Sequence, residues 1–139
     1  MAFRNTATDW GSVAKAFHWV VAALAIFMIG YGWWMIHFAE RAARPANFVF
    51  HTGLGYNLLL LVMLRLCWRA VDRPPGSPPD TLHWERIAAL AGHALLYLLL
   101  IGASVTGWLI VGSGRRPIDA PLLGFVPVPL LNNAGNRAF

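Results

Sequence analysis

The chain contains very little cysteine and little charge. Cys67 is its one cysteine in 139 residues, so the chain by itself forms no internal disulfide, no Cys-x-x-Cys-His attachment for a c-type haem and no iron–sulfur cluster. Charged residues make up 12% of the sequence and hydrophobic residues 58%, and the mean hydropathy is +0.54. This composition excludes an ordinary soluble domain and indicates an integral membrane protein in contact with lipid.

Three apolar stretches are long enough to cross a bilayer, which requires about 20 apolar residues per helix. They run from about residues 13 to 36, 48 to 68 and 87 to 111. We therefore expect an all-α membrane protein, an antiparallel bundle of transmembrane helices that forms one domain over residues 1–139. The first stretch is too long for the apolar core of a cleavable signal, and no small-residue cleavage site follows it, so we expect it to be retained.

The connections between these stretches favour antiparallel neighbours. The first connection, HFAERAARPAN at residues 37–47, is short and has Pro45 shortly before the second stretch. The second connection, DRPPGSPPD at residues 72–80, has four prolines among nine residues, which predicts an extended, non-helical segment. Residues 112–139 contain glycine and proline throughout and show no helical period, so we expect a loop or tail there.

The net charge of +5 arises from basic residues at the ends of the apolar stretches, which is a pattern of membrane topology rather than of nucleic-acid binding. On the side of the N-terminus and the second connection lie Arg4, Lys15, Arg65, Arg69, Arg73 and Arg86; on the other side lie Arg41, Arg44, Arg115 and Arg116. By the positive-inside rule, this excess predicts a cytoplasmic N-terminus. We expect no nucleic-acid partner.

Four of the five histidines, His18, His37, His51 and His93, lie in or at the edges of the apolar stretches. An ionisable side chain inside a bilayer is costly and indicates a functional site. A haem is flat and wide, so the helix that ligates it needs small residues one turn away on the same face. His51 has Gly55 one turn on, and His18 has an alanine one turn to either side. We therefore predict that His18 and His51 are metal ligands to haem.

The other two histidines have bulky neighbours. His93 has Tyr97 one turn on, and His37 has Trp33 one turn back. We interpret both as hydrogen-bonded packing residues or as residues with a role toward a quinone or a proton.

Depth in the membrane separates the two predicted ligands. His18 lies near the start of the first helix and His51 near the start of the second, and the helices run in opposite directions. The two side chains therefore lie toward opposite membrane faces and cannot bind the same iron. By depth, the candidate second ligands within this chain are His93 beside His18 and His37 beside His51, although the bulky neighbours count against both.

Arg65 and Arg69 lie one turn apart near the end of the second stretch. Snorkelling to the lipid headgroups explains such a pair. Pairing with haem propionates or with anionic groups of a quinone site explains it equally well. The sequence leaves both interpretations open.

Four motifs in this order resemble the bacterial cytochrome b561 family, and the resemblance covers nearly the whole chain. They are His18-Trp19, HTGLG at residues 51–55, RLCWR at residues 65–69 before the prolines, and GHALLYLLLIGASVTGW at residues 92–108. The resemblance implies a four-helix bundle in the bacterial plasma (inner) membrane that carries two b-type haems and accepts electrons from quinol.

In the family pattern His18 ligates one haem and His51 the other, and both second ligands come from a fourth helix. Three of the four expected helices are recognisable here, so we expect the chain to stop before the fourth. His93, in the motif HxxxY, matches a histidine common in the family that is not one of the four ligands. We expect His93 and Tyr97 to lie near a haem or a quinone.

We therefore predict a membrane electron carrier that needs no protein nucleophile, and leave open whether it is also a quinol oxidoreductase. One alternative is the cytochrome b subunit of a hydrogenase or dehydrogenase, which would hand electrons from a partner protein to quinone. Another is a haem-free membrane scaffold whose histidines only pack. An absorbance spectrum of the purified protein distinguishes the scaffold from the cytochromes. The redox partner protein, the terminal acceptor and a homodimer are also left open.

Overall fold

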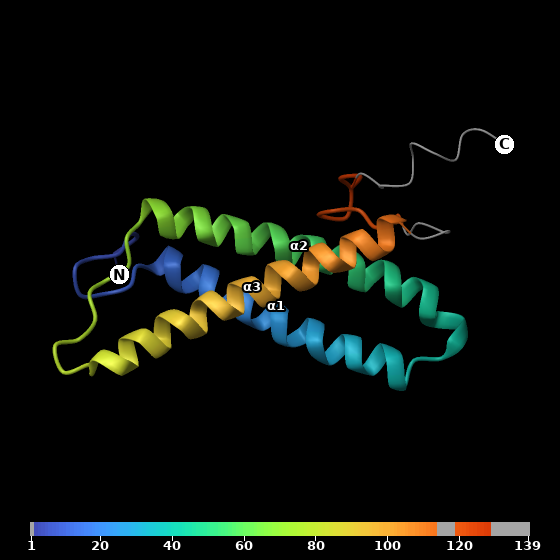
Figure 1. Ribbon diagram of the computed structural model, residues 1–139. Helices are drawn as coiled ribbons and strands as arrows, with labels where there is room; N and C mark the ends of the chain where they lie inside the picture. Colours follow the sequence, from blue (N-terminus) through green and yellow to red (C-terminus); the bar gives the residue numbers. More distant parts are fainter. Residues whose placement is uncertain (1, 114–118, 129–139) are drawn as a thin grey trace.

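A computed structural model describes residues 2–113 and 119–128, and three long helices make up most of them (Figure 1). Helix α1 spans Ser12–His37, α2 spans Arg44–Val71 and α3 spans His83–Ser113. A single 3-10 turn, η1 at Arg41–Ala43, precedes α2. All three long helices are long and apolar enough to cross a membrane. The prediction of an all-α membrane protein with three spanning helices is confirmed.

Each helix extends beyond the apolar stretch that predicted it. Helix α2 begins at Arg44, so Pro45 belongs to its first turn and not to the preceding loop, where we had expected it. Proline fits there because an N–H in the first turn of a helix has no hydrogen-bond acceptor within the helix, so the N–H that proline lacks is not needed. Helix α3 begins at His83, and the Glu85 carboxylate accepts a hydrogen bond from the Leu82 amide at 3.0 Å. Hydropathy detects only the part of a helix that crosses hydrocarbon, so it misses such polar first turns.

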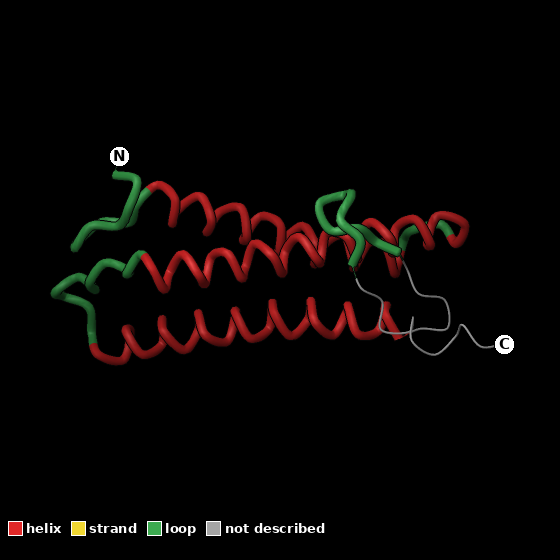
Figure 2. The backbone as a smooth tube through the Cα atoms, turned by 90° about the horizontal axis from the view of Figure 1, so that it is seen from above, coloured by secondary structure: helices red, strands yellow, loops and turns green. Residues whose placement is uncertain are grey.

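Helix α2 lies between α1 and α3 and packs against both, as the view in Figure 2 shows. The three helices alternate in direction, so the start of α1, the end of α2 and the start of α3 lie at the same end of the bundle (Figure 1). The buried core is small, and its packed cluster consists of Val21, Leu58 and Val62. Large apolar side chains elsewhere point outward, among them Ile29 and Leu98, which are 74% and 70% exposed. Such surfaces suit contact with lipid rather than with water.

An N-terminal segment holds the start of α1 against the end of α2. The Asn5 amide donates to Asp72 Oδ2 at 3.0 Å, and Asn5 Nδ2 donates to the carbonyl oxygens of Asp72 and Arg73 at 3.2 and 3.1 Å. The Gly11 amide donates to Asn5 Oδ1 at 2.8 Å. Asp72 is buried, and the proline-rich linker that follows is non-helical, as expected. These contacts fix the relative height of α1 and α2 at this end of the bundle.

Beyond α3, residues 119–128 form a tight turn that packs on α2. Leu122 and Val126 form an isolated antiparallel bridge around Leu123 and Gly124, which have φ angles of 54° and 80°. The Leu123 amide donates to Asn57 Oδ1 on α2 at 3.2 Å. The remainder of the expected tail lies outside the described residues, including Arg115, Arg116 and the end of the chain, where we expected the sequence to stop before a fourth helix.

Substituting Gly11 with alanine is expected to loosen the N-terminal segment. A Cβ at position 11 would lie 2.5 Å from the Arg4 carbonyl carbon and 2.7 Å from the Phe3 carbonyl oxygen, and both are backbone atoms that must move. We expect a loss of about 1 to 3 kcal/mol in the free energy of unfolding, as for other overpacked sites. Denaturant unfolding in detergent micelles, followed by circular dichroism, measures it.

The control for this variant is Gly102→Ala, because a Cβ at position 102 in α3 meets no atom within 4 Å. Equal stability of the Gly11→Ala variant and the unmodified protein would contradict the role given to this segment.

Candidate functional site

The predicted site residues fall into two groups at different levels of the bundle. One group lies where α1 begins and α2 ends, around a cavity of about 320 Å³ that is lined by Trp10, Lys15, His18, Arg65, Arg69 and His93, among others. The other group surrounds His51, nearer the opposite end of the bundle, around a cavity of about 380 Å³. The expectation from helix direction, that His18 and His51 lie at different depths, agrees with this arrangement.

In the first cavity, Arg65 connects all three helices. One of its terminal nitrogens lies 3.0 Å from His18 Nδ1 on α1, and its Nε donates to the Tyr97 hydroxyl on α3 at 2.9 Å. Its guanidinium carbon also lies 5.8 Å from the centre of the Tyr97 ring. Because a guanidinium group only donates, His18 Nδ1 accepts this hydrogen bond, and Nε2 is the ring nitrogen left for another group. Arg65 therefore points into the bundle rather than only toward the headgroups.

His93 lies on the wall of the same cavity as His18, despite its bulky neighbour. Tyr97 is drawn toward α2 by its hydrogen bond with Arg65. His93 Nδ1 lies 2.6 Å from the Ala89 carbonyl oxygen one turn back, so Nδ1 carries the proton and donates it. The lone pair of the neutral ring is then on Nε2, on an exposed side chain.

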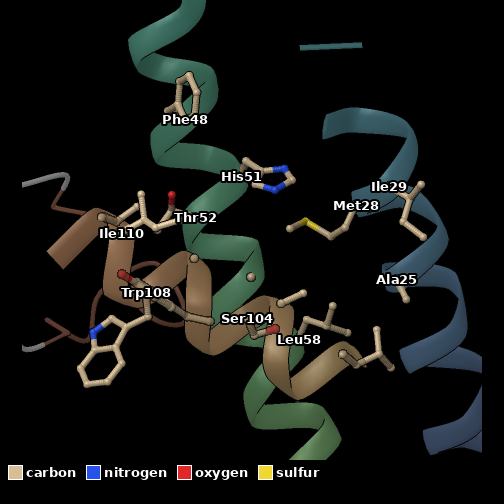
Figure 3. A pocket seen from close by; sticks show the side chains of 16 residues that line it. Ala25, Met28, Ile29, Phe48, His51, Thr52, Leu58, Ser104, Trp108 and Ile110 are labelled. Atoms are coloured by element: carbon tan, nitrogen blue, oxygen red, sulfur yellow. The ribbon is translucent and has the colours of Figure 1, made fainter. Parts of the chain in front are cut away.

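The second cavity lies between the three helices and has an apolar lining (Figure 3). Small residues provide much of its space, among them Ala25 on α1, Gly55 on α2, and Ser104 and Gly107 on α3. Gly55 is the small neighbour from which the sequence predicted an accessible face beside His51. An apolar lining with few polar groups is typical of a site for a small organic ligand or cofactor.

His51 gives the second cavity a buried, unpaired polar atom, and the Tyr56 hydroxyl is another within the described residues. The Nδ1 of His51 is buried and has no hydrogen-bond partner in the part of the chain that the structure describes. A buried nitrogen without a partner is unfavourable by roughly 1 to 3 kcal/mol, so its presence favours a bound group that interacts with this ring. The ring also stacks on Tyr31 of α1, a residue that the sequence did not single out.

His37 does not line the second cavity. Its ring stacks on Trp33 with ring centres 4.0 Å apart, and its Nδ1 lies 2.9 Å from the Trp33 carbonyl oxygen. This geometry favours the interpretation of His37 as a packing residue over that of a second ligand beside His51.

The two cavities suit a haem better than a bare metal ion. Within residues 2–113 and 119–128, no three His, Cys, Asp or Glu side chains come close enough to hold a metal ion by themselves. A haem brings its own ring nitrogens and needs only axial ligands from the protein. His51 and His18 supply imidazoles at the two levels, and Lys15, Arg65 and Arg69 line the first cavity with positive charge that complements carboxylates.

Comparison with known proteins gave two matches. A family model described as prokaryotic cytochrome b561 matches residues 9–138. Cytochrome b561 homolog 2 of Escherichia coli (strain K12) is 34% identical over 141 aligned residues, which cover 99% of this chain and 73% of that protein. No solved structure matches the chain significantly. Both matches extend over all three helices and therefore include His18, His51 and His93.

Proposed function

The chain belongs to the prokaryotic cytochrome b561 family, and on this basis we propose that it carries electrons from quinol through two b-type haems, one at each level of the bundle. Its membership of this family and its three apolar helices identify it as a bacterial membrane protein, a b-type cytochrome that functions in electron transfer. The haem number, the quinol, the inner membrane and the cytoplasmic N-terminus belong to the proposal.

One observation carries this proposal: two separate cavities lie at different depths, and each has a predicted ligand histidine on its wall. When bound, haem b supplies reversible one-electron chemistry. Two such groups at different depths make a route for electrons along the membrane normal. We assign His18 and His51 as their ligands.

The protein's own contribution differs between the two levels. Around His51, apolar side chains from three helices line the cavity, and a low-polarity surrounding tunes the potential of a bound redox group. Around His18, the cations Lys15, Arg65 and Arg69 line the cavity and are suited to carboxylates such as haem propionates. The sequence left open whether Arg65 snorkels or binds a ligand, and its inward contacts with His18 and Tyr97 support the second interpretation.

We place quinol beside the first cavity, next to His93 and Tyr97. Oxidation of a quinol to a quinone releases two electrons and two protons. The electrons would pass one at a time to the haems. His93 is exposed, and the lone pair of its Nε2 can accept one of the protons, while the other passes to water at the membrane surface. Tyr97 lies one turn further along α3, and its hydroxyl is held by Arg65.

Optical spectroscopy tests the proposal directly. Because the family pattern takes the second haem ligands from a fourth helix, the test uses the complete gene product. Purified after expression with an adequate haem supply, it should show a sharp reduced α band and a haem content of about two per protein. Addition of a soluble quinol under anaerobic conditions should reduce the oxidised haem, so that this band appears. A colourless protein would support the haem-free scaffold instead, and a haem protein that quinol does not reduce would refute the choice of donor.

Replacing Tyr97 with alanine is expected to slow reduction by quinol more than it lowers haem content. The change removes the hydroxyl that accepts from Arg65, and a hydrogen bond to a charged group is worth roughly 1.5 to 3 kcal/mol. If this stabilisation acts in the transition state of quinol oxidation and not in the ground state, its loss lowers the rate by about tenfold or more. Stopped-flow recording of the growth of the α band measures the rate of haem reduction, and a pyridine haemochrome assay measures the haem content.

The Tyr97→Phe variant separates the ring from the hydroxyl. It keeps the aromatic ring near the guanidinium and should show an intermediate rate. Equal rates for Tyr97→Ala and the unmodified protein would leave Tyr97 without a role in quinol oxidation.

A further inference from the structure

The imidazole of His51 leaves α2 in the direction of α1 (Figure 3) and meets two consecutive residues there, Tyr31 and Gly32. The rings of His51 and Tyr31 are nearly parallel, with an interplanar angle of 15° and ring centres 6.2 Å apart. This separation corresponds to an offset stack, an arrangement that aromatic pairs prefer. One face of the imidazole is therefore aligned with a ring from the neighbouring helix.

Tyr31 is itself held in place from both helices. Its hydroxyl donates to Asn47 Oδ1 at 3.0 Å, and Asn47 lies one turn before His51 on α2. On α1 its ring stacks with those of Phe27 and Trp34, at centre distances of 5.6 and 5.7 Å. The ring beside His51 is thus fixed by a hydrogen bond and by two aromatic neighbours, and it contacts two successive turns of α2.

Gly32 meets the edge of the imidazole. A Cβ at position 32 would lie 3.2 Å from His51 Cε1, which is closer than ordinary van der Waals contact. At Gly30, two residues earlier on the same helix, an added Cβ meets no atom within 4 Å. The absence of a side chain therefore matters at position 32, where it lets the imidazole approach the backbone of α1, and makes no difference at position 30.

We propose that Tyr31 and Gly32 are positioning residues that set the plane of the His51 imidazole. This inference rests on the proposed function, in which His51 is a haem ligand. An imidazole turns about its Cβ–Cγ bond, and the parallel Tyr31 ring and the backbone at Gly32 restrict that rotation from its face and from its edge. Groups that orient a metal ligand from outside tune the metal site without touching the metal.

The plane of an axial imidazole affects the electron paramagnetic resonance signal of an oxidised haem and its reduction potential. A change of this plane should therefore alter one of the two haems and leave the other unchanged. A role confined to stability would lower the yield of protein without changing either signal in the protein that folds.

The decisive experiment compares Gly32→Ala with its matched control, Gly30→Ala, in the full haem-loaded chain. We expect Gly32→Ala to shift the resonance signal and the potential of one haem, the same haem that His51→Ala removes. Gly30→Ala should leave both signals unchanged. Unchanged signals in Gly32→Ala, or an equal shift in Gly30→Ala, would overturn the inference.

The Tyr31 variants give a second, independent measurement that holds even if Gly32→Ala accumulates poorly. Tyr31→Leu removes the aromatic ring and should shift the signal of the same haem. Tyr31→Phe keeps the ring, loses only the hydrogen bond to Asn47 and should restore most of the original signal. Identical spectra for Tyr31→Leu and the unmodified protein would overturn the role of Tyr31.

Failure of this inference can be told apart from failure of the proposed function. If the unmodified chain binds no haem, both are refuted. If it binds two haems, and His51→Ala removes one while Gly32→Ala and Tyr31→Leu leave that haem unchanged, only the role of Tyr31 and Gly32 is refuted.

Discussion

His51→Ala is expected to remove one haem and leave the other in place, so the haem content of the purified protein should fall by about half. The change deletes an imidazole whose Nδ1 is buried and unpartnered in the described structure, at a cavity with an apolar lining. His18, at the other level, keeps its contact with Arg65. A pyridine haemochrome assay, normalised to protein, measures the loss, and the α band shows which haem remains.

Two further variants serve as controls for this result. His37→Ala removes a histidine that stacks on Trp33 and does not line the cavity, so haem content should stay the same. His93→Ala should also keep both haems, because we place His93 beside quinol and not on a haem. Full haem content in His51→Ala together with a loss in His93→Ala would mean that the small neighbour Gly55 led to the wrong ligand.

Arg65→Leu is expected to have the largest effect on stability. It removes two charge-assisted hydrogen bonds, one to His18 on α1 and one to Tyr97 on α3. The contacts that this side chain makes from α2 to both neighbouring helices are then lost. Each such hydrogen bond is worth roughly 1.5 to 3 kcal/mol when buried, and solvent exposure weakens it. We therefore expect a loss of about 2 to 4 kcal/mol in the free energy of unfolding. Titration with a denaturing detergent, followed by circular dichroism, measures this loss.

Arg69→Leu is the matched control for Arg65→Leu. Arg69 lines the same cavity and lies one turn away, but it makes no side-chain hydrogen bond within the described residues. The Arg69→Leu substitution should therefore lower the free energy of unfolding much less than Arg65→Leu does. Equal losses for the two variants would mean that both arginines act mainly at the lipid headgroups. A double-mutant cycle of Arg65→Leu with Tyr97→Phe isolates the energy of their contact.

Much of the fold follows from hydropathy alone. A helix must bury about 20 apolar residues to cross hydrocarbon, so three such stretches predict three spanning helices, which the structure has. The polar first turns, including Pro45 and Glu85, were missed because they lie beyond the hydrocarbon and carry no hydropathy signal.

Part of the candidate site was also predictable, where one helix determines the geometry. Gly55 lies one turn from His51, so both line one cavity, and alternating helix directions separate His18 from His51 in depth. The side chain of Tyr31 was not predicted, because nothing on α1 indicates which residue of α2 it meets. The double glycine around it, Gly30-Tyr31-Gly32, was the available signal, and only one of these glycines contacts His51.

The order of residues by itself determined the class of protein, its three spanning helices and the residues that share a face within each helix, because these depend on composition and on the helical repeat. Tertiary structure alone decided that Arg65 joins His18 to Tyr97, that His93 lies at the same cavity as His18, and that Tyr31 and Gly32 meet His51. The reason is physical. The rotation and height of one helix against another are set by the packing of many side chains at once, and no short segment of sequence contains that information.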